Sequence, residues 1–214
     1  MGRAFAVAHN ARSIARKSKG IPVELKKVTN HLDSVFDSFL GLFDGSAKNT
    51  LAAKAYFAGG CIYCLANDKP VKDYDLFLLD RQGCGEIEKL DLWKCKTEYA
   101  LSRGKYQVVT KYYGTPDKCV GQFDFKHNMY FYKPHGNSVE SACGEFDSLF
   151  TNELIFNESR ARDIEGVYLR IERFVQRGFV ATPEMIAKIK RRTTNKKINE
   201  YAKKLKNTPR RHRY

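Results

Sequence analysis

The sequence predicts an α/β domain with a mixed β-sheet flanked by helices, followed by a basic helical extension at the carboxyl end. Three observations carry this prediction. Short β-branched and aromatic runs alternate with amphipathic stretches of helical period. Of the 214 residues 43% are apolar, which is enough for a buried core. The basic residues gather at the two ends of the chain.

The expected helices follow from apolar residues at helical spacing and from the residues that interrupt them. The first is 31–43, where six apolar side chains lie on one face. Asp44-Gly45-Ser46 separates it from the second, and Pro70 lies just beyond the third. Gly178 separates the last two. The full set of expected helices is 31–43, 46–54, 60–66, 86–102, 163–177 and 183–192.

The expected strands are runs rich in β-branched and aromatic residues, or runs that alternate apolar with polar positions. Residues 106–113 are of the first kind and 122–126 of the second. Residues 129–132 and 153–156 are assigned as strands with a loop or partly helical stretch between them. The set is 55–58, 73–79, 106–113, 122–126, 129–132 and 153–156.

Charge divides the chain into three parts. Residues 1–30 hold seven Lys or Arg and one Glu, and residues 188–214 hold twelve and one, whereas the middle is near neutral within an overall charge of +14. We expect a basic arm (1–30), a central α/β domain (31–165) and a helical, strongly basic segment (166–214). Such cationic ends predict a polyanionic partner, most simply RNA. The alternative is that they only keep the protein soluble.

Composition also excludes several classes of protein. No apolar run approaches the ~20 residues that cross a bilayer, so no membrane partner is expected. The chain has six cysteines but no export signal is found in the sequence. We therefore expect reduced thiols and a cytoplasmic location, which would be the host cytoplasm if a phage encodes the chain. Cys61-x2-Cys64 has no second pair at zinc-ligand spacing. The sequence leaves the oligomeric state open.

Two carboxylates stand at positions i and i+2 of an expected strand. Asp73 and Asp75 therefore project from one face, while Tyr74, Leu76 and Leu78 share the other. Two neighbouring carboxylates repel each other, and a divalent cation relieves that repulsion. Mg²⁺, or Mn²⁺ in its place, suits such a pair because it takes carboxylate, water and phosphate oxygens. A pair of exposed aspartates at a turn is the plainer interpretation.

Gly59-Gly60 joins the strand 55–58 to the helix 60–66. A turn without side chains lets backbone N–H groups approach phosphate oxygens. Each feature alone is common, but the glycine pair followed by twelve residues and Asp73-x-Asp75 is more specific.

This combination resembles the signature of polymerase-β-type nucleotidyltransferases, in particular the head domain of tRNA CCA-adding enzymes and bacterial poly(A) polymerases. The resemblance runs in patches from Tyr56 to Ile189. It implies a nucleotidyltransferase-like fold, nucleotide phosphates on Gly59 and Gly60, and catalytic metal on Asp73 and Asp75. A third carboxylate lies on a later strand of that family, and Asp124 is the candidate.

Two further stretches extend the resemblance. Asp124-Phe-Lys-His-Asn128 is similar to the family's Asp-Phe-Thr-x-Asn segment, which would instead give Asp124 a role at the nucleotide sugar. Arg170 and Arg173 stand in a stretch similar to its Arg-x-x-Arg-Phe helix, with ion pairing inside the helix as the alternative. Lys72, Asn128, Arg170 and Arg173 are therefore expected at the nucleotide. Nucleic-acid contacts are expected from Lys190, Arg191, Arg192, Lys196, Lys197, Lys203 and Lys204.

The chain also departs from the family. Tyr63-Cys64 stands where the family has Arg-Asp, Gln122-Phe123 stands where it has Arg-Arg, and no Glu-Asp-x-x-Arg element is found. The resemblance thus implies a compact, phage-type member that transfers a nucleotide from an NTP to an RNA or tRNA 3′ end with Mg²⁺. The alternatives are a toxin-like enzyme that modifies a protein, and an inactive relative that binds RNA.

Overall fold

The computed structural model describes residues 23–207, so most of the expected basic arm and the last seven residues lie outside the described part. The helices are α1 Val23–Leu40, α2 Gly45–Lys54, α3 Gly60–Ala66, α4 Arg81–Glu88, α5 Pro116–Val120, α6 Ile164–Gln176, α7 Pro183–Arg191 and α8 Asn195–Asn207, with 3₁₀ turns η1 Lys126–Asn128 and η2 Asp147–Leu149. The strands are β1 Ala55–Ala58, β2 Tyr74–Leu78, β3 Cys95–Lys96, β4 Ala100–Arg103, β5 Tyr106–Val109, β6 Tyr130–Tyr132 and β7 Glu140–Ser141.

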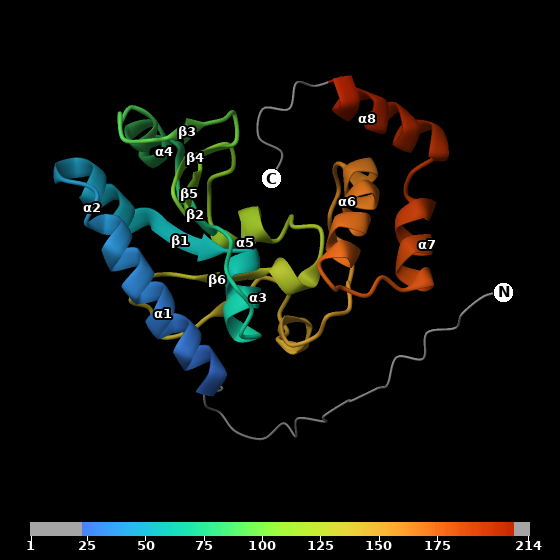
Figure 1. Ribbon diagram of the computed structural model, residues 1–214, viewed down its shortest axis with the longest axis horizontal. Helices are drawn as coiled ribbons and strands as arrows, with labels where there is room; N and C mark the ends of the chain where they lie inside the picture. The colour runs from blue at the N-terminus through green and yellow to red at the C-terminus, as the bar shows by residue number, and fades with distance from the viewer. Residues whose placement is uncertain (1–22, 208–214) are drawn as a thin grey trace.

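The strands form one mixed sheet in the order β3-β4-β5-β2-β1-β6-β7. Strands β2 and β5 are parallel, with Asp75 opposite Gln107, and the other neighbouring pairs are antiparallel. Figure 1 shows α1 and α2 on one side of the sheet and α6, α7 and α8 on the other. The predicted α/β class, with a mixed sheet between helices, is confirmed.

The two faces of the sheet differ in what covers them. Tyr74, Leu76 and Leu78 of β2 enter the larger core with α1, α3 and α4. On the opposite face Phe77 joins a smaller core that Val120 of α5 completes. Because side chains alternate along a strand, Asp75 shares this second face. The face of β2 expected to be buried is therefore the one that the larger core covers.

Several predicted elements are confirmed and others are displaced. The strand 55–58 and the helix 60–66 agree with β1 and α3, and the helices 46–54, 163–177 and 183–192 agree with α2, α6 and α7 within one or two residues. The helix predicted over 31–43 begins earlier, at Val23, and ends at Leu40. The strand 106–113 ends early, at Val109.

The helix predicted over 86–102 is wrong. Helix α4 begins earlier, directly after Asp80, whose side chain accepts a hydrogen bond from the Gly83 N–H at 2.8 Å and caps it. The helix ends at Glu88. The Thr97 hydroxyl accepts from the Ala100 N–H at 3.0 Å and turns the chain from β3 into β4. Gly104, at φ +61°, then closes the β4–β5 hairpin. Pairing with β5 thus outweighs the helical spacing of the apolar residues.

The strand predicted over 122–126 is also wrong. Only Phe125 makes a bridge, with Phe156, and the chain then enters η1. The strand predicted over 153–156 is likewise reduced to this bridge and one between Glu153 and Val180. The two runs thus pair with each other or with the segment after α6, and not with a strand of the sheet.

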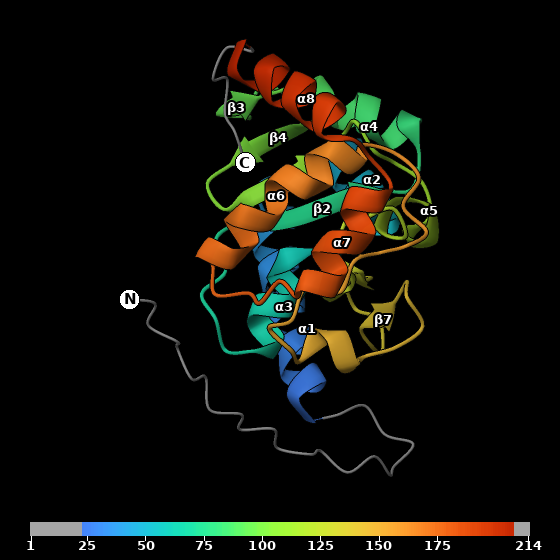
Figure 2. The same ribbon diagram turned by 90° about the vertical axis from the view of Figure 1, so that its right-hand side faces the viewer.

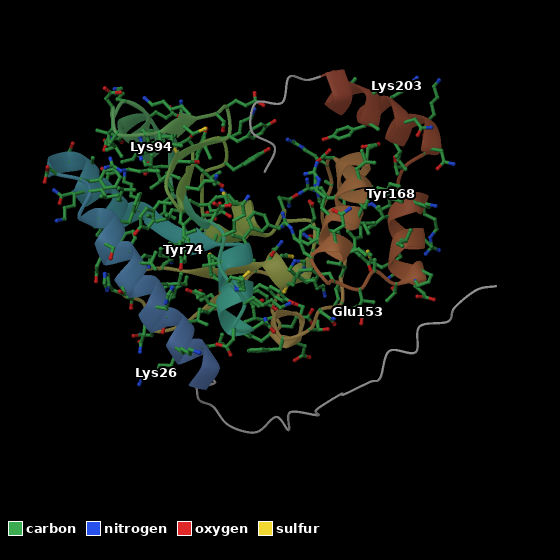
Figure 3. All side chains as sticks on the ribbon, viewed as in Figure 1. Lys26, Tyr74, Lys94, Glu153, Tyr168 and Lys203 are labelled. Atoms are coloured by element: carbon green, nitrogen blue, oxygen red, sulfur yellow. The ribbon has the colours of Figure 1, made fainter. Side chains whose placement is uncertain are left out.

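Helices α6, α7 and α8 form a separate layer in front of the sheet, and Figure 2 shows α8 crossing above α6. The Thr182 hydroxyl accepts from the Met185 N–H and caps α7. Tyr168 lies between α6 and α7, and Lys190 stands over its ring at 5.5 Å (Figure 3). Within residues 23–207, no helix combines the length and apolarity that a membrane span requires.

Candidate active site

A cavity of about 610 Å³ lies between the start of β2, the turn into α3 and the inner face of α6. The lining residues predicted from the sequence are Gly60, Lys72, Asp73, Asp75, Asn128, Arg170 and Arg173. The structure therefore brings seven of the nine expected catalytic and nucleotide-binding residues to one place. Gly59 and Asp124 stand beside the cavity and are described below.

Asp73 and Asp75 stand on the wall of the cavity that the sheet provides. Asp73 is about one-third exposed, and the Lys72 ammonium lies 3.5 Å from its carboxylate. Burial, and to a smaller extent the charge of Asp73, raise the pKa of Asp75 to about 7. The two carboxylates thus lie close enough to disfavour each other's ionised form, with Lys72 as the cation beside Asp73.

The Gly59-Gly60 turn lies directly against these carboxylates. Gly59 has φ +86°, a conformation that a side chain disfavours, and its N–H donates to the Tyr130 carbonyl. A Cβ placed on Gly59 would lie 3.8 Å from Oδ2 of Asp75, and one on Gly60 would lie 4.0 Å from Oδ1 of Asn128. The turn therefore leaves bare backbone between the carboxylate and the amide.

Arg170 reaches the cavity from α6 and is held by two carboxylates. Its Nε donates to Asp124 at 2.5 Å, and its Nη2 donates to Asp124 at 3.1 Å and to Asp163 at 2.9 Å. Burial lowers the pKa of Arg170, but the bonds and charges of Asp124 and Asp163 raise it above its ordinary value. Asp163 itself has φ +55°, and its carboxylate folds over Gly166, where a Cβ would collide with it.

Asp124 does not join the two cavity carboxylates. Its side chain is 15% exposed and lies between the guanidinium groups of Arg170 and Arg160, the latter 3.1 Å away. Among the described residues no cluster of three or more His, Cys, Asp or Glu has the arrangement of a metal site. The prediction that Asp124 is a third metal ligand does not match this geometry, because arginines occupy both of its oxygens. Its position instead fixes Arg170.

The far end of the cavity is aromatic, and sequence reasoning missed most of it. Phe174 and Arg177 follow Arg170 at four and seven positions along α6, so the helical period alone could have found them. Phe179 follows the helix, and Tyr63 faces it with ring centroids 5.0 Å apart. Residues from α3 and α6 together thus make an apolar wall.

His127 is buried within this wall. Its ring packs 4.3 Å from Phe179 and 5.2 Å from Tyr63, and neither ring nitrogen has a hydrogen-bond partner among the described residues. Burial lowers its pKa to about 3, with a smaller contribution from Lys69. The imidazole is therefore neutral at physiological pH and acts here as an aromatic ring.

The cations expected at nucleic acid all lie on the exposed surface of α7 and α8 or between them. Some of these side chains also interact with the protein itself. The Arg192 guanidinium donates to the carbonyls of Glu158 and Arg160, and Lys190 stands over Tyr168. Lys203 projects from α8 (Figure 3), as do Lys196 and Lys197 from its first turn.

Comparison with known proteins gives both a family and a fold. Residues 26–152, more than half of the chain, match the model of the family described as "Gad2: Gabija anti-defense 2 family protein". A search of curated proteins found no match.

Among solved structures, the CCA-adding enzyme of Bacillus stearothermophilus in complex with CTP aligns with a TM-score of 0.51 and 18% identity, over 70% of this chain and 41% of that one. A second CCA-adding enzyme with CTP aligns with a TM-score of 0.53 and 17% identity, over 84% and 48%. The chain spans less than half the length of either enzyme. These alignments confirm the nucleotidyltransferase-like fold that the motifs implied.

Proposed function

We infer that this chain, which belongs to the Gabija anti-defense 2 (Gad2) family, is a metal-dependent nucleotidyltransferase. It would transfer a nucleoside monophosphate from an NTP to an acceptor hydroxyl and release pyrophosphate. One observation carries the proposal: Asp73 and Asp75 meet the Gly59-Gly60 turn on one wall of a cavity, on the fold that CCA-adding enzymes share.

The carboxylate pair fits a divalent cation. Burial and the neighbouring charge of Asp73 raise the pKa of Asp75, and a bound cation would offset both effects. Carboxylate oxygens are also the hard ligands that Mg²⁺ and Mn²⁺ prefer. Two carboxylates are also the number that Mg²⁺ uses when substrate phosphates and waters supply the rest. When bound, the metal would neutralise charge on the phosphates and on the attacking oxygen.

The remaining residues would bind and orient the nucleotide. The bare backbone of Gly59 and Gly60 leaves room for phosphate oxygens beside Asp75. Arg170 and Arg173 face them from α6, and the carboxylates of Asp124 and Asp163 hold Arg170 in a fixed orientation.

The side chains around the carboxylate pair suit other parts of the nucleotide. Asn128 lies near Gly60, where its amide could bond a ribose hydroxyl, and Lys72 stands at the open side. The aromatic wall of Tyr63, Phe174 and Phe179 offers rings for a base to stack on. Positioning the acceptor hydroxyl in line with the α-phosphate is then most of what the protein must do.

An RNA 3′ end, that of a tRNA among them, is the acceptor that the charge supports best. The seven expected cations lie on α7, α8 and the turn between them, the layer that also carries Arg170 and Arg173 toward the cavity. Backbone phosphates would neutralise this surface.

A protein acceptor is the second candidate, and the family description favours it. An anti-defense protein can act by modifying a component of the defense itself, and transfer of NMP to a protein hydroxyl uses the same cavity. The chemistry at Asp73 and Asp75 would be unchanged.

The test supplies purified protein with Mg²⁺, total RNA, host protein extract and each α-labelled NTP in turn, beside the Asp73→Asn/Asp75→Asn double variant. Label on RNA that the double variant fails to transfer supports the proposal and identifies the nucleotide. Label on a protein alone replaces the RNA acceptor by the second candidate. No label with any NTP would mean an inactive relative that binds RNA or a partner.

A further inference from the structure

Three tyrosines lie exposed around the end of the β4–β5 hairpin that is distant from its turn. Tyr99 is 42% exposed, Tyr112 is 55% and Tyr113 is 45%, which makes them three of the most exposed large apolar side chains in residues 23–207. We call Tyr99, Tyr112 and Tyr113, together with Lys111, the tyrosine patch. Exposed aromatic rings gathered at one place on a surface mark an interaction site more often than scattered ones do.

The rings are already arranged for stacking. Tyr99 and Tyr112 are stacked on each other, with centroids 6.4 Å apart and an interplanar angle of 29°. The Lys111 ammonium stands 4.7 Å over the Tyr99 ring and also lies 3.8 Å from the Glu98 carboxylate. Neither tyrosine belongs to either core of the sheet. Tyr99 and Tyr112 therefore form an exposed stacked pair of rings with a cation beside it.

The basic helix α8 lies within electrostatic range of this patch. Tyr201, in the middle of α8, is close enough to contribute to the raised pKa of Tyr99, whose first cause is the hydrogen bond with Glu98. Helix α8 holds five lysines and one glutamate. Figures 1 and 2 show α8 at the same end of the molecule as β3 and β4, in the layer that faces the sheet. The aromatic rings and a cationic helix thus share one end of the molecule.

Strand β5 leads from the candidate active site toward the patch, which lies just beyond its end. Gln107 of β5 lines the cavity opposite Asp75, and Tyr112 follows five residues later. At ~3.3 Å per residue the separation is at most ~17 Å. A chain of a few nucleotides can bridge that distance.

We propose that the tyrosine patch and α8 bind single-stranded RNA: the bases stack on Tyr99 and Tyr112, and the lysines of α8 neutralise the backbone. This inference rests on the proposed function, because it describes how an RNA acceptor leads its 3′ end to Asp73 and Asp75. The combination of stacking rings with nearby cations is what sequence-tolerant binding of single strands requires. A peptide would leave the excess positive charge of α8 without a partner.

The experiment measures fluorescence anisotropy of a labelled 12-nucleotide single-stranded RNA with the full chain. We expect Tyr99→Ala/Tyr112→Ala to bind at least about five-fold more weakly, because a stacked base contributes at least that factor. Tyr99→Phe/Tyr112→Phe keeps the rings and should bind as the wild type does. Phe150→Ala removes another exposed ring, 38% exposed, from a different part of the molecule and serves as the control.

Salt and strandedness separate stacking from charge. The two tyrosine variants should leave the slope of log affinity against log salt unchanged, whereas Lys196→Ala/Lys197→Ala should make it shallower by about 0.7 for each phosphate that a lysine no longer neutralises. A duplex RNA, whose bases are already stacked, should bind the alanine variant as tightly as the wild type. Thermal unfolding of each variant verifies that it is folded.

The outcomes distinguish this inference from the proposed function. Asp73→Asn/Asp75→Asn should bind the RNA normally and transfer nothing. Equal RNA affinity for the wild type and the alanine variant would overturn the inference, even if nucleotidyl transfer to RNA is found. If the alanine variant no longer transfers label to a protein while its RNA affinity is unchanged, the inference is also overturned, and the patch is a protein-docking surface.

Discussion

Replacing Asp75 with asparagine should stabilise the metal-free protein at neutral and alkaline pH while it removes nucleotidyl transfer. The reason lies in the position of the carboxyl, beside Asp73 on the cavity wall. Burial and the charge of Asp73 raise its pKa from 3.8 to about 7. Folding therefore opposes the ionised form of Asp75, and an amide of nearly the same shape carries no such charge.

The magnitude follows from the shift of the pKa. Each unit corresponds to ~1.4 kcal/mol, so a shift of about three units destabilises the folded wild type by at most about 4 kcal/mol. Below pH 4 both states hold the proton, and the effect vanishes. Between pH 4 and 7 the unfolded chain has released the proton and the folded chain keeps it, so the penalty grows. Above pH 7 it is constant.

The assay is urea unfolding in EDTA at pH 4, 5.5 and 8 for the wild type and Asp75→Asn. The free energy of unfolding of the variant should exceed that of the wild type by only about 0.6 kcal/mol at pH 4, where the unfolded carboxyl is little more than half ionised, and by increasingly more toward pH 8. Mg²⁺ at pH 8 should stabilise the wild type and leave the variant unchanged, since a bound cation offsets the same repulsion.

Asp91→Asn removes an exposed carboxylate from the turn after α4 and controls for the loss of one negative charge. If Asp75→Asn is neutral or destabilising at pH 8, or if its effect is the same at pH 4 and pH 8, the reasoning about the carboxylate pair is refuted.

Three other substitutions test other parts of the site. Gly59→Ala places a side chain at φ +86°, 3.4 Å from the Phe123 ring, so urea unfolding should show a loss of about 1–2 kcal/mol and calorimetry a loss of nucleotide affinity. Gly104→Ala is the control: it has φ +61° and open space around it, so it should lower stability in the same way but leave nucleotide affinity unchanged. His127→Phe should stabilise by about 1 kcal/mol or more at pH 7, because two buried nitrogens lack partners among the described residues. The difference in free energy of unfolding between the variant and the wild type should grow as pH falls from 6.5 toward 3, because in that range the unfolded wild type takes up a proton and the folded one does not. A difference that does not depend on pH would contradict the burial of a neutral imidazole. Arg170→Ala should lower the free energy of unfolding in urea by about 3 kcal/mol, since it leaves Asp124 and Asp163 without the guanidinium that pairs with them. Arg170→Lys should restore only part of that stability, because lysine lacks the paired N–H donors of a guanidinium. Full rescue by lysine would show that charge alone matters.

Local patterns predicted the part of the fold around the site, and long-range pairing decided the rest. The segment from Ala55 to Ala66 has an apolar strand, a glycine pair and a short helix in order, and each element forms where its own residues favour it. The run 86–102 has apolar residues at helical spacing but becomes part of a helix and two strands, because β5 supplies an edge that β4 pairs with. The sequence predicts the strand β5, but the helical spacing of the preceding residues hides its pairing with Ala100–Arg103 across the turn at Gly104.

The candidate site shows the same division. Asp73 and Asp75 could be assigned to one face from alternation alone, and Gly59 from the turn that it makes. Asp124 could not be assigned, since its role depends on Arg170, 46 positions away in the chain, whose guanidinium occupies its carboxylate. His127 is ambiguous in the sequence for a related reason: only the packing of Tyr63 and Phe179 around it shows that it is buried and neutral.

The most direct test of the central claim follows the two ends of the triphosphate separately. The NTP that the protein accepts is labelled in one reaction at the α-phosphorus and in another at the γ-phosphorus, with Mg²⁺ and the acceptor. Nucleotidyl transfer predicts that the α label appears on the acceptor and the γ label in pyrophosphate, and that Asp73→Asn/Asp75→Asn abolishes both. Label from the γ position on the acceptor, or transfer that survives the double substitution, would contradict the assignment of this cavity as a nucleotidyltransferase site.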